Sequence, residues 1–127
     1  MATDLPVAVF EIKNYMVIFR QLEERDFDGV IAQIRGLVRC TGIGTQDNSD
    51  YRLDVYFLSS DSDYPAPQVN LEDKQGSIFM PVDNMMMFVD VLRNEKPIFG
   101  HLRADNPNWT SVTTTNEPVG AGDEDFA

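Results

Sequence analysis

The stretch from Gly76 to Pro97, GSIFMPVDNMMMFVDVLRNEKP, constrains the fold of this chain more than any other. It predicts a short strand over Ser77–Met80, a break at Pro81 and a helix over Asp83–Asn94. The helix must end before Pro97, because a residue that precedes proline is driven out of the α region. No other segment has the apolar period of a helix, so this single helix has to cover the strands that the rest of the chain forms.

The apolar side of the predicted helix is wider than contact with one sheet requires. Apolar side chains cover roughly 200° of its circumference, against the ~100° that suffices for a helix lying on a sheet. Since so wide an arc needs a second surface, two interpretations remain. Either a long loop or the C-terminal hairpin covers the extra width, or the helix packs against a second copy of the chain. The candidate contacts of such a homodimer are Met87, Phe88 and Val91.

Alternation of apolar and polar residues predicts strands on both sides of the helix. These strands are Val7–Lys13, Gly29–Thr41, Tyr51–Ser59, Gln68–Glu72, Ile98–Ala104 and Trp109–Thr115. The apolar run Tyr15–Phe19 is either a further strand or a continuation of the first one past a bulge near Asn14. The charged stretch Glu23–Asp28 predicts a turn, and Thr41–Asp50 is rich in the residues of hairpin turns.

The strand over Gly29–Thr41 has the clearest alternation. We expect one face of it to carry Val30, Ala32, Ile34, Val38 and Cys40. In the strand that returns beside it, we expect the inward side chains to be those of Leu53, Val55 and Phe57. The two strands together predict a long hairpin.

These elements predict an α+β fold, in which an antiparallel sheet of about six to eight strands carries one main helix, Asp83–Asn94. The 127 residues are enough for one domain, which we assign to residues 1–115. Residues 116–127 form an acidic tail, in which Val119 and Phe126 are candidates for contacts with a neighbouring chain.

The formal net charge is −11, and most of it lies in the second half of the chain. A field of this sign repels polyanions, so it disfavours nucleic acid as a partner. The single cysteine excludes an internal disulfide. The chain has neither an apolar run of about 20 residues, which a membrane span needs, nor the basic start of a signal peptide. We therefore expect a cytoplasmic protein with no membrane contact.

Two residues invite a catalytic or metal-binding interpretation, and neither has the partners that it would need. His101 is the only histidine, and its place on a strand predicts an outward polar side chain. Cys40 falls on an apolar strand face, which is typical of a buried, inert thiol. We expect no catalytic residues, no metal and no cofactor.

One set of side chains matches a binding chemistry. On the outer face of the long hairpin we expect cations and an aromatic ring, and the set consists of Gln33, Arg35, Arg39, Arg52 and Tyr56. Lys13 and Arg20, from the first strands, are candidates to join it. Cations that neutralise phosphates and a ring that stacks on bases are what single-stranded nucleic acid recognition uses. The other interpretation is an ordinary polar face, paired with Asp54 and Glu11.

The order of elements resembles a known fold. Several strands precede Gly76-Ser77-Ile78-Phe79-Met80, which leads into the apolar helix over Met85–Leu92. This arrangement is similar to that of the single-stranded-DNA-binding transcriptional regulators, such as the Whirly proteins and positive cofactor four, and to a group of uncharacterised cyanobacterial proteins near that fold. The resemblance implies dimers that pair through their β4–α units. This chain has no counterpart of the lysine-rich Whirly motif.

We therefore expect a non-enzymatic, homodimeric binding or regulatory module with a possible protein partner. The alternative is a single-stranded nucleic acid binding protein that uses the basic and aromatic sheet face.

Overall fold

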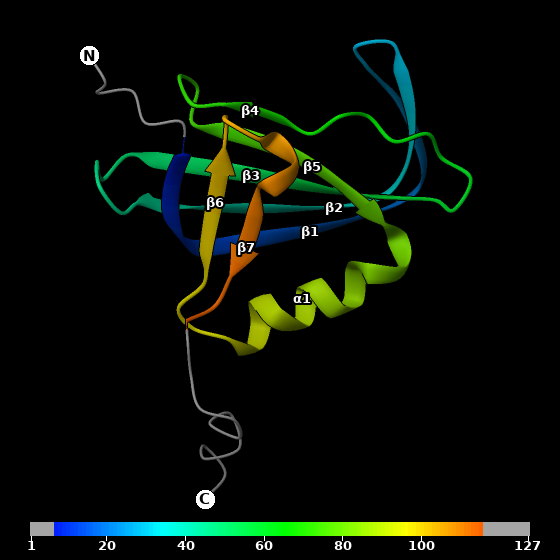
Figure 1. The fold of residues 1–127 in the computed structure, drawn as a ribbon. Helices are drawn as coiled ribbons and strands as arrows, with labels where there is room; N and C mark the ends of the chain where they lie inside the picture. The colour runs from blue at the N-terminus through cyan, green and yellow to red at the C-terminus, as the bar shows by residue number, and fades with distance from the viewer. Residues whose placement is uncertain (1–6, 116–127) are drawn as a thin grey trace, which may run out of the picture.

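A long, bent hairpin forms the centre of the molecule (Figure 1). In the computed structural model, which describes residues 7–115, β1 (Val7–Phe27) pairs with β2 (Val30–Gly44). The chain reverses at Asp28 and Gly29, which both have positive φ, 53° and 92°. Positive φ at both central residues is what a two-residue hairpin turn requires. The prediction of a turn over Glu23–Asp28 is therefore wrong, because most of that stretch is still strand.

Within residues 7–115, seven strands form one sheet, in the order β4-β5-β3-β2-β1-β6-β7. The other strands are β3 (Asp50–Leu58), β4 (Gln68–Asn70), β5 (Gln75–Pro81), β6 (Phe99–Arg103) and β7 (Ser111–Thr113). A sheet with one main helix is thus confirmed. The purely antiparallel sheet is not, because β3 and β5 run parallel. After β3 the chain returns along the sheet through residues 59–74, so β5 starts at the same end as β3.

The helix α1 (Met85–Asn94) connects β5 to β6 and crosses one face of the sheet, as Figure 1 shows. We call this the inner face, and the opposite one the outer face. The helix begins two residues later than predicted, because Val82–Asn84 forms a 3-10 turn, η1. Met85, Val89 and Leu92 are its buried residues.

Bulges in β1 and β2 change which side chains share a face. The run Tyr15–Phe19 continues the first strand, since β1 skips one pairing between Ile12 and Asn14. In β2 the pairing with β3 shifts between Ile34 and Gly36. An extra residue in one strand reverses the alternation of all that follow it.

The β2 bulge makes one sequence prediction wrong. Val38 and Cys40 belong to the core beneath α1, whereas Ala32 and Ile34 belong to a separate cluster on the outer face. The inward positions predicted for the returning strand are confirmed, since Leu53, Val55 and Phe57 all lie in the core beneath α1.

The second core is closed by the tip of the β1–β2 hairpin rather than by the helix. It contains Ala32, Ile34, Leu37, Tyr56 and Leu58. The ring of Phe27, at the end of β1, packs edge-on against Tyr56 and Phe79, with centroid distances of 5.4 and 5.0 Å. Because Phe79 lies on β5, beyond β2 and β3, the tip must fold back across the outer face.

The C-terminal part of the sheet completes the core beneath α1. Leu102 on β6 is fully buried, and Val112 on β7 packs against the same cluster as Phe88. The chain between these strands forms a 3-10 turn, η2 (Pro107–Trp109), so the predicted strand over Trp109–Thr115 is shorter than expected. The acidic tail, with Val119 and Phe126, lies outside the described residues. No helix within residues 7–115 is long and apolar enough to cross a membrane.

Candidate binding surfaces

The strand register aligns polar and apolar side chains in rows across the outer face. The first row contains Asn14, Thr41, Arg52 and Gln75. The second contains Met16, Arg39, Asp54 and Ser77, and the third Ile18, Leu37, Tyr56 and Phe79. The outer face is therefore polar at one end, charged in the middle and apolar where the hairpin tip covers it.

One buried carboxylate holds two guanidinium groups in the middle row. Asp54 is only 3% exposed. Arg39 donates two hydrogen bonds to it, from Nε to Oδ1 at 2.8 Å and from Nη2 to Oδ2 at 3.1 Å. This bond raises the pKa of Arg39. Arg52 lies farther away, with Nε 3.6 Å from Oδ2. A single negative charge thus faces two positive ones.

Arg52 is held in place by a second group. Its Nη2 donates to Oε1 of Gln75 at 2.7 Å, and its backbone N–H donates to the carbonyl of Lys74 at 3.0 Å. Its Nε is buried and has no hydrogen-bond partner within residues 7–115. Since Arg39 already occupies both oxygens of Asp54, the charge of Arg52 is incompletely compensated.

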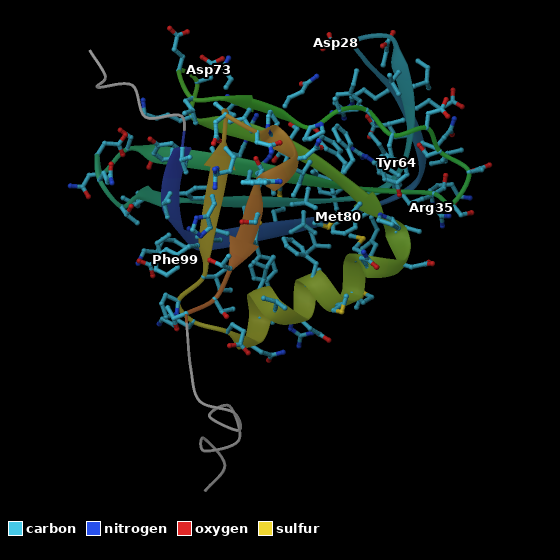
Figure 2. All side chains as sticks on the ribbon, in the orientation of Figure 1. Asp28, Arg35, Tyr64, Asp73, Met80 and Phe99 are labelled. Atoms are coloured by element: carbon cyan, nitrogen blue, oxygen red, sulfur yellow. The ribbon has the colours of Figure 1, made fainter. Side chains whose placement is uncertain are left out.

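A cleft of about 460 Å³ opens beside Arg52 at the polar end of the outer face. Three cations line it, Lys13, Arg52 and Lys74, together with the carboxylates of Asp50 and Asp73. The neutral polar side chains in the lining are Asn14, Thr41 and Gln75. Lys13 also forms an ion pair with Glu11 at 3.2 Å. Figure 2 labels Asp73 at this end of the sheet and Arg35 at the other.

The structure brings together three of the five side chains proposed for nucleic acid binding. Arg39, Arg52 and Tyr56 lie on the outer face. Gln33 lies on the other side of β2 and donates to Glu24 at 3.0 Å, whereas Arg35 sits in the bulge near the start of α1.

Tyr56 does not present the exposed ring that base stacking needs. Its side chain is 5% exposed and stacks on Phe79, with ring centroids 5.5 Å apart. Its hydroxyl accepts a hydrogen bond from Nη1 of Arg25 at 2.9 Å. The sequence prediction that Lys13 joins the proposed set agrees with its place in the cleft beside Arg52, whereas Lys74 was missed. Lys74 lies in a turn with φ 58°, so alternation does not predict its placement. Lys13 is the extra residue of a bulge in β1.

A second candidate surface lies along β1. The strand β6 pairs only with Val7–Glu11, so within residues 7–115 the stretch 14–22 of β1 has no strand partner on the side away from β2. The large hydrophobic side chains exposed along this stretch are Tyr15, Met16, Phe19 and Leu22, and Phe19 is 69% exposed. We call this stretch the free edge of β1.

A groove of about 450 Å³ separates the free edge from the beginning of α1. Phe19, Met85 and Met86 line it, and so do the cations Arg20 and Arg35. Met86 is 57% exposed. Helix geometry places Met86 on the flank that faces β1, and sequence reasoning missed it because its neighbours on that flank are polar.

The three side chains proposed for a dimer contact differ in exposure. Met87 is 64% exposed and points away from the core. Phe88 is half-buried and packs on Phe57, with ring centroids 5.8 Å apart, and Val91 is also half-buried. The core thus covers part of the wide apolar arc, and Met86 and Met87 are left to solvent.

His101 and Cys40 take structural positions. Nε2 of His101 lies 2.8 Å from Oγ1 of Thr113, a contact that joins β6 to β7. Burial, and then the nearby charge of Arg103, lower its pKa. Cys40 is fully buried, and burial raises the pKa of its thiol to about 12. In the part of the chain that the structure describes, no cluster of three or more His, Cys, Asp or Glu residues is placed to hold a metal ion.

Comparison with family models, with curated proteins and with solved structures finds no match for this chain. The resemblance to the Whirly proteins and positive cofactor four therefore rests on the order of elements alone. The outer face and the free edge of β1 are the two surfaces of the described residues that offer a binding chemistry.

Proposed function

We propose that this protein is a non-enzymatic binding module that works as a homodimer, and that its two copies join along the free edge of β1. The observation that carries this proposal concerns one groove: the strand backbone beside it has no partner on that side within residues 7–115, and Phe19 and Met86 are exposed on either side of it. A strand edge of this kind is a template for pairing with another chain, and exposed apolar side chains favour their own burial.

The surface has the properties of a two-fold contact. In a two-fold dimer the same patch meets itself, and a strand that pairs with its own copy across the axis runs antiparallel to it. The cations Arg20 and Arg35 line the groove, and Arg20 is paired with Glu23 at 3.1 Å. Asp83 of η1 and Asp90 of α1 are exposed carboxylates outside this lining. When a two-fold axis places Arg35 of one copy opposite a carboxylate of the other copy, charges of opposite sign meet.

The test is the molar mass in solution. We expect sedimentation velocity to give the mass of a dimer for the wild-type chain and that of a folded monomer for Phe19→Glu and for Met86→Glu. The matched control is Trp109→Glu, because Trp109 is exposed but lies on η2. Circular dichroism checks that each variant is folded. A monomeric wild-type chain at concentrations up to about 100 μM, where weak transient contacts already associate, would contradict the proposal.

A second candidate function, the binding of single-stranded nucleic acid, has an observation of its own in its favour. Arg39 and Arg52 share one carboxylate on an open sheet face, and Lys13 and Lys74 lie at the same end. Such a cationic strip favours contact with a phosphate backbone. The net charge of −11 and the buried ring of Tyr56 weigh against it.

This second function predicts salt-dependent binding of a short oligonucleotide. The affinity should fall as salt rises, because bound cations release counterions from the phosphates. Arg39→Ala should weaken binding, whereas Arg93→Ala, an exposed cation on α1, should leave it unchanged. Fluorescence anisotropy of a labelled oligonucleotide measures both effects. No binding at about 20 mM salt would exclude this function.

A further inference from the structure

We propose that the cleft between Lys13, Arg52 and Lys74 is a binding site for a phosphate group. Its three cations come from three separate segments: a bulge in β1, the strand β3 and the turn before β5. These segments are far apart in the sequence and their like charges repel one another, so the fold itself holds the three cations close together. The site goes beyond the proposed homodimer, because it lies on the outer face and not on the free edge of β1.

Arg52 is oriented for an anion before any anion binds. The amide of Gln75 holds one end of its guanidinium through Nη2 at 2.7 Å, and Asp54 lies 3.6 Å from Nε. The hydrogen bond from the backbone of Arg52 to Lys74 ties the turn to the strand. A planar guanidinium with a fixed direction and spare donors suits the tetrahedral oxygens of phosphate.

The charges around Arg52 are unequal. The carboxylate of Asp54 is used by Arg39 in two short hydrogen bonds, so it neutralises Arg52 only in part. Of the two carboxylates that line the cleft, that of Asp73 accepts a hydrogen bond from Asn70 at 2.9 Å within its own turn. Asp50 is the remaining acid in the lining. The other two cations of the cleft have acidic neighbours. Lys13 is paired with Glu11 at 3.2 Å. The hydrogen bond from Tyr51 lowers the pKa of Asp47, and the charge of Lys74 helps to lower it. Arg52 is therefore the cation of the cleft with the least compensation and the one that an anion would meet.

The size and lining of the cleft indicate more than a bare ion. A volume of about 460 Å³ falls in the range of small-molecule sites. The hydroxyl of Thr41 and the amide of Asn14 add neutral hydrogen-bonding groups, and Ile43 and Tyr51 add apolar surface. The ligand class is thus a phosphate carried by a larger molecule, either a small phosphate ester or the backbone of a nucleic acid.

The experiment uses the full chain and phosphate itself as the probe. In ¹⁵N-resolved NMR at constant ionic strength, we expect inorganic phosphate and pyrophosphate to cause saturable shifts of the amides around Lys13, Arg52 and Lys74. Chloride at the same ionic strength should not. Arg52→Gln and Lys74→Gln should each weaken binding by about tenfold, the effect of losing one charge-assisted contact. Arg93→Gln, on α1, is the control and should bind like the wild type.

The outcomes are distinct. If Arg52→Gln does not fold, Lys74→Gln carries the test, because Lys74 lies in a turn outside the core. Absence of saturable shifts, or equal binding by wild type and Lys74→Gln, overturns the site.

A second experiment adds a deoxythymidine oligonucleotide. Binding of it that Lys74→Gln weakens assigns the phosphate to nucleic acid. Pyrophosphate binding without oligonucleotide binding supports the site and assigns it to a small ester. Neither result depends on whether the protein is a monomer or a dimer, so the phosphate site is tested separately from the proposed homodimer.

Discussion

At the scale of single residues, Asp54 is the residue on which the outer face depends most. Asparagine at this position keeps the shape but removes the charge that faces Arg39 and Arg52. Because a buried partner of two guanidinium groups is lost, we expect Asp54→Asn to lower the free energy of unfolding by about 2–3 kcal/mol. Urea denaturation followed by circular dichroism measures the change.

The matched control is the exposed ion pair between Arg103 and Asp105, whose side chains meet at 2.7 Å. Exposed ion pairs contribute little, because water and salt screen them. We therefore expect Asp105→Asn to leave the unfolding curve unchanged within error. If Asp54→Asn unfolds at the same urea concentration as Asp105→Asn, Asp54 does not anchor the outer face.

Two glycines on β2, Gly36 and Gly42, have neighbours of different rigidity: a flexible side chain lies beside Gly36 and strand backbone lies beside Gly42. A methyl group at Gly42 would overlap the backbone carbonyl of Glu11, whereas at Gly36 it would meet the flexible end of Met85, 2.5 Å from Sδ. We expect Gly42→Ala to cost about 3 kcal/mol and Gly36→Ala about 1 kcal/mol, because a methionine tip moves and a paired strand does not. Chemical denaturation of both variants measures the two losses in the free energy of unfolding. Equal losses would contradict this account.

At the scale of elements, the hairpin tip is the lid of the second core. Phe27 closes this core with two edge-on ring contacts. We expect Phe27→Ala to lower the free energy of unfolding by about 2 kcal/mol, less than for a fully buried phenylalanine, because Phe27 is only partly buried. Amides of residues 23–34 should then exchange with deuterium faster. Ile31→Ala, an exposed residue of the same tip, is the control. Unchanged exchange in Phe27→Ala would show that the tip is not held by this ring.

The same elements show what sequence patterns can predict. Alternation identified β3 and β6 well, because both strands are regular and have one face in the core beneath α1. It failed where a single extra residue reverses the faces, as at the β2 bulge beside Arg35. A bulge has no local signature here, since it depends on pairing with β3 and on the bend that brings Phe27 over Tyr56.

The candidate sites were predicted only in part for the same reason. Arg39 and Arg52 follow from alternation within one hairpin and were placed together correctly. Lys74 lies beside them because β5 pairs in parallel with β3, and no pattern in the sequence predicts that pairing. Met86 likewise gains its role from the groove beside Phe19, a contact between segments far apart in the chain.

At the scale of the whole molecule, the net charge of −11 opposes any contact between two copies. Repulsion between like-charged molecules acts over the Debye length, which shrinks as salt is added. The contact proposed along the free edge of β1 is mainly apolar, so salt should weaken the repulsion more than it weakens the contact. We therefore expect the dimer to tighten by several-fold between about 0.02 and about 0.3 M sodium chloride.

Phosphate binding should respond in the opposite direction, because cations in an open cleft attract an anion less when salt screens them. Sedimentation velocity measures how the dimer affinity changes with salt, and NMR titration measures how phosphate affinity changes. Both use the same protein preparation and the same salt series. Sodium sulfate cannot replace the chloride, since it would compete for the cleft. If the dimer weakens with salt in parallel with phosphate binding, ion pairs such as those of Arg20 and Arg35, rather than apolar contact, hold the copies together. The role given to Phe19 and Met86 would then be wrong, while the phosphate site would stand.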